Sequence, residues 1–240
     1  IEENKLKSVG LIGANGFVGR SIKKFLLGNK EICTTCITRE NYEESKVKKE
    51  YDVLINAAMP SKRFWANQNP YLDFNETVKK TFDIANNWKS SKIVQISSIS
   101  ARSQTNTTYG RNKAAAEKLV DNDNNLILRL GPMYGETLNK GVLIDLLKHN
   151  PVYISPESLY CFAPVDWVGG WIANNTHLTG ILDLGGNNAV SIGKVAKSIG
   201  SHSIFKGPID NQIVSEEIKL APQAENVINY IINCKKNNLN

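Results

Sequence analysis

The stretch GLIGANGFVGRS, residues 10–21, places Gly13, Gly16 and Gly19 at intervals of three between a strand-like and a helix-like segment. Gly13 allows a tight turn, Gly16 allows the backbone to come close to a bound pyrophosphate, and Gly19 allows close helix–strand packing. The N-terminus of the following helix then faces the anion. In this context the spacing predicts a dinucleotide-binding loop, and the alternative is a merely tight strand–helix turn.

Short apolar segments alternate with helix-like ones through the first half of the chain. The predicted strands are SVGLIG, EICTTCIT, DVLINAA, KIVQISS and NLILRLG. Strands that alternate with helices predict parallel pairing with helices on both faces, and nearly continuous apolar strands fit a sheet covered on both sides. We therefore expect an α/β, Rossmann-type doubly wound sheet. Residues 1–135 are expected to bind a dinucleotide, and residues 136–240 to form a small substrate-binding lobe with elements that return to the core.

The formal net charge is +6, but lysines and arginines are scattered and the densest group, ESKVKKE, is interrupted by acids. This pattern makes a nucleic-acid partner unlikely and suits a phosphate-bearing small molecule equally well. No apolar run approaches the length of a membrane span, so no membrane partner is expected. The first residues lack the apolar core of a secretory signal, which predicts a cytoplasmic protein.

Cys33 and Cys36 occur as CTTC. A second pair at zinc spacing is lacking, and residues three apart on a strand point to opposite faces. We predict buried free thiols and no metal site.

The end of the second predicted strand reads CITREN. An acidic residue at this place binds the ribose 2′-hydroxyl of NAD, whereas an arginine accommodates the 2′-phosphate of NADP. Arg39 lies about twenty residues after Gly19, and Glu40 comes one position late. The sequence favours NADP, with NAD as the alternative, and a solvated Arg39 is the third interpretation.

Hydroxyl groups end the predicted strand VQISS, and a helix-like stretch then sets Tyr109 four residues ahead of Lys113. Ligands lie beyond the carboxyl ends of the strands in such sheets, and residues four apart share one helix face. We expect the ammonium of Lys113 to lower the pKa of Tyr109 from its usual value of about 10. Tyr109 would then exchange a proton with a substrate oxygen. Alone, a Tyr–Lys pair of this spacing is usually structural.

The ordered segments GANGFVG, INAA, ISS, YGRNK, LRLGPMYG, PVDWVGG and DLGG resemble those of an extended short-chain dehydrogenase/reductase of the NAD-dependent epimerase/dehydratase family, over nearly the whole chain. The resemblance implies that Ser98, rather than Ser97, forms a catalytic triad with Tyr109 and Lys113, and that Arg129 is structural. It implies a cofactor site formed, besides Arg39, Tyr109 and Lys113, by Gly13, Asn15, Gly16, Phe17, Val18, Gly19, Ala57, Ala58, Asn75, Leu130, Gly131 and Met133. Asn75 has a second interpretation, as a helix residue bonded to backbone.

Members of this family commonly act on sugar nucleotides. Dehydratases of the family carry an Asp–Glu pair after the catalytic hydroxyl, where this chain has Ile99 and Ser100. The resemblance therefore implies an oxidoreductase for a sugar or nucleotide-sugar, with a keto-sugar reductase favoured over an epimerase that retains NAD. A non-catalytic dinucleotide-sensing or nucleic-acid-binding protein is the alternative of another class. Four cations are either substrate contacts or solvated charges: Lys62, Arg63, Arg102 and Arg111. The segment AAAEKLV is a candidate homodimer face.

Overall fold

The computed structural model describes residues 6–237, which form two compact units. The first unit contains the described residues up to Leu130 together with Val168–Leu182. The second contains Gly131–Trp167 and the described residues from Asp183 onward. The chain therefore leaves the first unit after Leu130 and returns to it for one short stretch.

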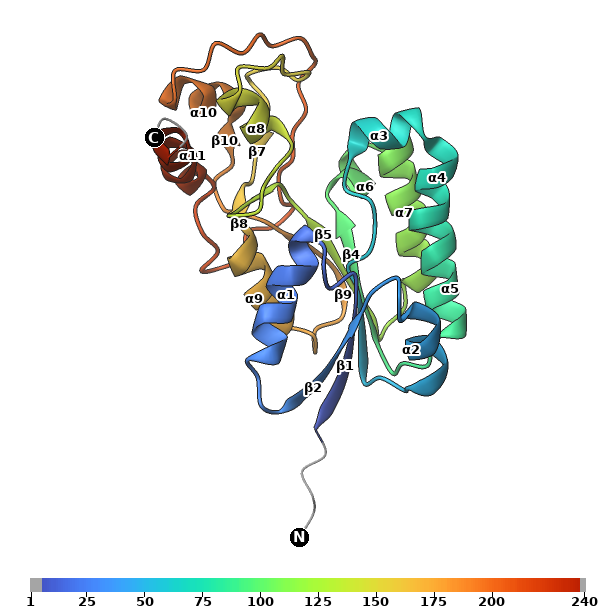
Figure 1. Ribbon diagram of the computed structural model, residues 1–240. Coiled ribbons are helices and arrows are strands. Elements are labelled where there is room, and N and C mark those ends of the chain that lie inside the picture. Colours follow the sequence, from blue (N-terminus) through green and yellow to red (C-terminus); the bar gives the residue numbers. More distant parts are fainter. Residues whose placement is uncertain (1–5, 238–240) are drawn as a thin grey trace. The chain divides into compact units, whose positions relative to one another are not determined.

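A six-stranded sheet in the order β2-β1-β3-β4-β5-β9 is the centre of the first unit (Figure 1). Its strands are β1 Lys7–Ile12, β2 Ile32–Ile37, β3 Val53–Asn56, β4 Ile93–Ser98, β5 Leu126–Leu130 and β9 Gly180–Leu184. The pairings of β1 with β2 and β3, of β3 with β4, and of β4 with β5 are all parallel. The prediction of a doubly wound parallel sheet is confirmed.

Helices cover both faces of this sheet. Helices α1 and α9 lie on one face, and α2 to α7 lie on the other (Figure 1). Their bounds are α1 Phe17–Leu27, α2 Tyr42–Lys48, α3 Arg63–Gln68, α4 Pro70–Phe74, α5 Lys80–Asn87, α6 Ser100–Ser103, α7 Thr108–Val120 and α9 Val165–Asn174. Between α4 and α5 the chain forms a π-helical turn, η1 Asn75–Lys79. Because one face is covered by α4–α7 and the other by α1 and α9, the central strands are enclosed, and β3 is buried at every position.

The strand order reverses next to β1. The chain runs from β1 to β2 on one side, and β3 then pairs with β1 on the other side. Loops that leave the carboxyl ends of β1 and β3 therefore diverge, and such a switch point is where doubly wound sheets bind ligands. The glycine loop follows β1, and Ala57 and Ala58 follow β3.

The prediction that the thiols of Cys33 and Cys36 are buried is wrong. Cys33 is exposed and Cys36 is half-buried, and both are free. β2 pairs only with β1 in the sheet order, so it is an edge strand and carries less cover than the central strands. Sequence alternation could not show this, because an edge strand and a central strand can carry the same apolar residues.

The second unit has its own hydrophobic core, to which Leu146, Phe162, Ile192 and Ile231 contribute. Its elements are β6 Met133–Tyr134, α8 Val142–Leu147, β7 Leu159–Tyr160, β8 Ala163–Pro164, β10 Val190–Ser191, α10 Ile192–Ser198, a 3₁₀ turn η2 Ala224–Asn226, and α11 Val227–Asn237. Ser191 caps the N-terminus of α10, because its hydroxyl accepts the amide N–H of Lys194 at 3.2 Å. Among the residues that the structure describes, no helix is both long and apolar enough to span a membrane.

Candidate active site

The glycine loop has the tight-turn geometry that the spacing of Gly13, Gly16 and Gly19 predicts. Gly13 has a φ of +84°, in the region that favours glycine, and a Cβ atom there would lie 2.8 Å from the backbone of Ala57 and Ala58. A Cβ atom on Gly19 would lie 2.0 Å from the carbonyl oxygen of Gly13, so α1 packs directly on the turn. Gly16 is exposed, and a Cβ atom there would meet only the Gly13 oxygen, at 3.3 Å. The loop thus leaves open space in front of the N-terminus of α1, which fits a dinucleotide pyrophosphate.

The other predicted residues of the loop surround this space. Asn15 is exposed, whereas Phe17 and Val18 are half-buried at the start of α1. Ala57 donates its amide N–H to the carbonyl of Ile12 at 2.9 Å, which holds the end of β3 beside the glycine turn. The structure therefore brings the predicted loop residues and the two alanines together at the carboxyl edge of the sheet.

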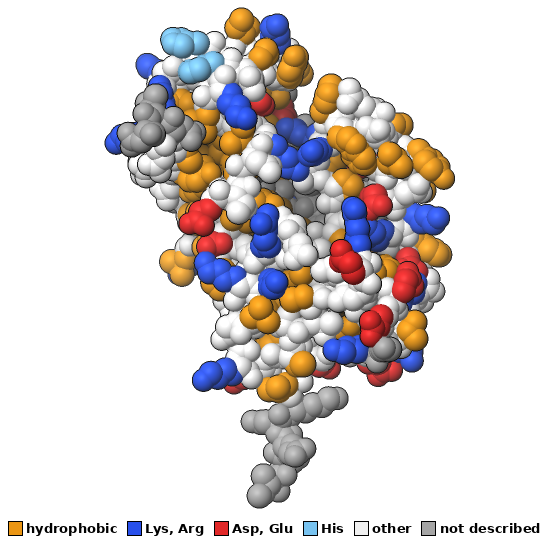
Figure 2. All heavy atoms as spheres, viewed as in Figure 1, with side chains coloured by type: hydrophobic (Ala, Val, Ile, Leu, Met, Phe, Trp, Pro, Cys, Tyr) orange, Lys and Arg blue, Asp and Glu red, His pale blue; other side chains and the backbone are white. Residues whose placement is uncertain are grey.

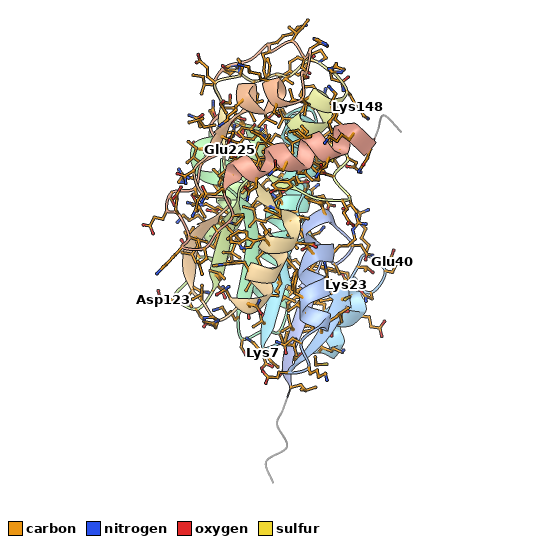
Figure 3. All side chains as sticks on the ribbon, turned by 90° about the vertical axis from the view of Figure 1, so that its left-hand side faces the viewer. Lys7, Lys23, Glu40, Asp123, Lys148 and Glu225 are labelled. Atoms are coloured by element: carbon orange, nitrogen blue, oxygen red, sulfur yellow. The ribbon has the colours of Figure 1, made fainter. Side chains whose placement is uncertain are left out.

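The end of β2 carries both an arginine and an acid. Arg39 and Glu40 are exposed, and Figure 3 labels Glu40 in the segment that follows β2. The Thr38 hydroxyl donates a hydrogen bond to the Glu40 carboxylate. That bond, the backbone amide and the nearby Arg39 lower the pKa of Glu40, so the carboxylate is charged at neutral pH. Both candidate determinants of the cofactor are thus present in one turn.

Ser98, Tyr109 and Lys113 come together at the carboxyl end of β4. Ser98 is the last residue of that strand, and Tyr109 and Lys113 lie one turn apart on α7. The Ser98 hydroxyl accepts the amide N–H of Ser100 at 3.2 Å, and its proximity to the Tyr109 hydroxyl favours the phenolate of that tyrosine and so acts to lower its pKa. The ammonium of Lys113 lies over the Tyr109 ring, 5.2 Å from its centroid. Only 6 % of Tyr109 and 3 % of Lys113 is exposed.

Helix α7 starts with a capping hydrogen bond and with a close contact between Gly110 and the preceding loop. The hydroxyl of Thr107 accepts the amide N–H of Gly110 at 3.0 Å. A Cβ atom on Gly110 would lie 2.1 Å from the carbonyl oxygen of Gln104, so only glycine lets the loop after α6 lie against this turn. Gly110 fixes the helix position right beside Tyr109, and its role could be inferred only once the loop path was known.

The pKa values of Tyr109 and Lys113 differ from the sequence-based expectation. Burial raises the pKa of Tyr109, and the cation that opposes this rise is Arg63 on α3, with a smaller contribution than the Ser98 hydrogen bond. Burial also lowers the pKa of Lys113 to about 7, against the opposite pull of Asp73 and Glu117. The prediction that Lys113 lowers the pKa of Tyr109 fails here, because the ammonium lies over the ring and is itself desolvated.

Of the four candidate substrate-binding cations, Arg63 is the one that acts electrostatically on Tyr109. It is half-buried, and its Nη1 donates to Oε1 of Gln104 at 3.1 Å, on the loop that lies against Gly110. Lys62, Arg102 and Arg111 are exposed.

Ser97 has a different environment from Ser98. Its hydroxyl donates to Oε1 of Glu117 at 2.6 Å, and Arg129 binds the same carboxylate, with Nη2 to Oε2 at 2.6 Å. Glu117 lies on α7 and is buried, so this cluster fastens the helix to β4 and β5. The geometry leaves Ser98, not Ser97, with its hydroxyl at Tyr109.

Asn75 begins the π-helical turn η1 and is half-buried. π-Helical turns frequently occur at functional sites, and this one packs against α7. The sequence NETVK contains no signal for such a turn. A buried carboxylate next to it, Asp73, also escaped sequence reasoning because it reads as a polar position on a helix.

The remaining predicted residues divide between the two units. Leu130 is buried at the end of β5, and its carbonyl accepts the amide N–H of Ile99 at 3.2 Å. Gly131 and Met133 belong to the second unit, where Gly131 donates its N–H to Leu184 and Met133 pairs with Ala163.

No protein-family model matches the sequence, and comparison with curated proteins also finds no match. Solved structures with this fold include dTDP-4-dehydrorhamnose reductase from Bacillus anthracis in complex with NADP, with a TM-score of 0.74 and 16% identity over 95% of this chain and 99% of that one. UDP-glucuronic acid 4-epimerase from Bacillus cereus, bound to NAD, has a TM-score of 0.71 and 16% identity over 95% and 99% of the two chains. The NAD-dependent NDP-hexosamine 5,6-dehydratase TunA has a TM-score of 0.74 and 14% identity over 96% and 98%. Likeness to solved structures at this identity establishes the fold.

The buried amine leads to a prediction on stability. Because the pKa of Lys113 is about 7 in the folded chain and about 10.5 in an unfolded one, unfolding takes up a proton between these values. Lys113→Met should therefore be more stable than the wild type near neutral pH. The gap should shrink by up to about 1.4 kcal/mol per pH unit as the pH rises through this window. Urea unfolding at several pH values measures it.

Lys118→Met is the matched control, since Lys118 lies on the same helix and its side chain is 75% exposed. This variant should show no comparable change with pH across the same window. A wild type that is as stable as Lys113→Met at neutral pH would contradict the assignment of a desolvated amine.

Proposed function

We propose that the chain is an NAD(P)-dependent oxidoreductase of the extended short-chain dehydrogenase/reductase type that reduces a keto group of a nucleotide-linked sugar. The observation that carries the proposal is the buried pair of Tyr109 and Lys113 beside the half-buried Ser98, at the edge of the sheet that also holds the glycine loop. The fold neighbours that act on nucleotide-linked sugars support the substrate class.

A reduced nicotinamide, when bound, supplies a hydride. The residues of the chain bind and protonate the oxygen of the substrate carbonyl. Tyr109 donates its phenolic proton to that oxygen, and the Ser98 hydroxyl donates a hydrogen bond to the same atom. The raised pKa of Tyr109 keeps the phenol protonated at neutral pH, which suits the direction of reduction. The charge of Arg63 stabilises the phenolate that remains after proton transfer.

Tyr109→Phe tests the proton donor. Removal of one hydroxyl should reduce kcat for NADPH oxidation with a 4-keto-6-deoxy sugar nucleotide by about 10²- to 10⁴-fold, the usual contribution of general acid catalysis. The Kd for NADPH should not change. Tyr153→Phe, at an exposed tyrosine of the second unit, is the control and should keep full activity. Wild-type turnover in Tyr109→Phe would refute the role.

NADP is the proposed cofactor, because the exposed Arg39 follows β2 where a 2′-phosphate would lie. Arg39→Ala should weaken NADPH binding by about tenfold or more through loss of a charged contact, and should leave NADH binding unchanged. Lys30→Ala, which removes an exposed charge after α1, should change neither. Calorimetric titration of both nucleotides measures the effect.

The charged Glu40 favours a second candidate function, an epimerase that retains NAD. In that case the wild type would prefer NADH, Glu40→Ala rather than Arg39→Ala would weaken binding, and freshly purified protein would carry bound nucleotide.

A homodimer is the proposed assembly. Large apolar side chains of the α4–α5 run are exposed, with Tyr71 75%, Phe74 46% and Phe82 54% accessible. Figure 2 shows hydrophobic side chains gathered on the surface where Figure 1 places α3 and α4. Exposed apolar patches of this kind mark interaction sites, and the half-buried Ala114 and exposed Ala115 of α7 would allow close helix approach.

Phe82→Glu tests the dimer. A charge on this face should convert the protein to a monomer in sedimentation velocity, because burying an unpaired carboxylate in an apolar interface is costly. Leu27→Glu, at an exposed leucine that ends α1 on the other face of the sheet, is the control and should leave the sedimentation coefficient unchanged. A wild type that sediments as a monomer at micromolar concentration would contradict the proposal.

A further inference from the structure

Asp73 is a carboxylate with no exposed surface. It lies on α4, is 0% exposed, and its Oδ2 accepts a hydrogen bond from Nδ2 of Asn112 at 2.7 Å. Its Oδ1 is buried and has no hydrogen-bond partner among residues 6–237. A carboxylate accepts several hydrogen bonds in water, and one that is buried with a single bond is costly unless a cation compensates it.

Lys113 follows Asn112 directly on α7, and Arg111, which precedes it, is exposed. The Lys113 ammonium is also buried, so each charge lacks the solvent that would otherwise stabilise it. Asp73 acts electrostatically on both members of the pair, raising the pKa of Lys113 and that of Tyr109. The buried carboxylate on α4 therefore favours the charged form of the buried amine on α7.

Other charged groups lie on the elements packed against α7, and most are already paired. Glu117 binds Ser97 and Arg129. Glu76 of η1 binds Lys80 at 2.6 Å, and Asp83 of α5 binds Lys46 at 2.8 Å. Arg63 acts on Tyr109 and binds Gln104.

Exposed Arg102 of α6 and Arg111 of α7 itself are cations and would repel the Lys113 ammonium. Asp73 is the carboxylate with a spare buried oxygen. It is the group best placed to hold Lys113 charged.

We propose that Asp73 is a positioning residue of the active site, whose carboxylate keeps the Lys113 ammonium charged and directed to the Tyr109 ring. This inference rests on the proposed oxidoreductase function. The simpler possibility is that Asp73 only ties α4 to α7 through Asn112. The two roles need different properties of Asp73. A structural tie needs the hydrogen bond to Asn112, whereas a group that keeps Lys113 charged needs the negative charge.

Asp73→Asn separates charge from shape. The amide has nearly the same size and keeps an oxygen that accepts the Asn112 bond. Loss of the negative charge makes the ammonium form of Lys113 less stable and the phenolate of Tyr109 more stable. The alkaline limb of the pH profile of kcat/KM should therefore move to lower pH by about one unit, a loss of about tenfold at pH values on that limb. Activity at the acidic end and the Kd for NADPH should match the wild type.

Asn112→Ala is the matched control. It removes the hydrogen bond and keeps the charge, so the melting temperature should fall while the alkaline limb stays in place. If Asp73→Asn instead lowers the melting temperature and leaves the pH profile unmoved, Asp73 is a structural tie and the inference is overturned.

A second measurement does not require activity. In protein carrying ¹³C-labelled lysine, the Cε resonance of Lys113, identified by its loss in Lys113→Met, reports the titration of the amine. Its midpoint should be lower in Asp73→Asn than in the wild type and unchanged in Asn112→Ala. An unchanged midpoint in an active enzyme overturns the inference and spares the proposed function. A lowered midpoint in a protein that reduces no keto-sugar supports the charge-holding role and refutes the function.

Discussion

The inner face of α7 buries the amine of Lys113 and the phenol of Tyr109 away from water. Burial of the charged amine costs free energy, and the neighbouring groups of the first unit must offset that cost. A desolvated ammonium loses its hydration, and only neighbouring negative charge or loss of the proton can offset the loss. Burial brings the pKa of Lys113 to about 7 even with Asp73 and Glu117 pulling upward. A chain selected only for stability would place an apolar side chain here, so the lysine indicates a purpose other than packing.

Two contacts hold α7 on either side of this lysine. Asn112 binds Asp73 on α4, one residue before Lys113, and Glu117 binds Ser97 and Arg129, one turn after it. The helix is thus fixed to a neighbouring helix and to two strands of the sheet. Because Tyr109 lies on the same face one turn earlier, both contacts also determine where its hydroxyl meets Ser98.

Much of this arrangement could be predicted from the sequence. The glycine spacing predicted a turn that only glycine can form, and the φ of Gly13 with the close approach of Gly19 shows the physical reason. Alternating strands and helices predicted the sheet. Strand ends in parallel sheets share one edge, and the four-residue spacing of Tyr109 and Lys113 predicted a common face. These inferences rest on local periodicity, which a single sequence displays.

The parts that escaped prediction depend on distant neighbours. The exposure of Cys33 follows from the place of β2 in the sheet order, and the π-helical turn at Asn75–Lys79 follows from packing against α7. The pKa of Tyr109 was expected to fall, and it rises because desolvation outweighs the effects of Ser98 and Arg63. Desolvation is a property of the whole packed unit, so no residue pattern within a helix could reveal its size.

The balance of buried charge explains why Asp73 and Glu117 cannot be equivalent. Arg129 neutralises Glu117 through its Nε and Nη2 contacts, whereas Asp73 receives only a neutral amide. Asp73 therefore favours the charged form of Lys113, against the larger effect of burial. This electrostatic effect connects α4 with the helix that carries both Tyr109 and Lys113.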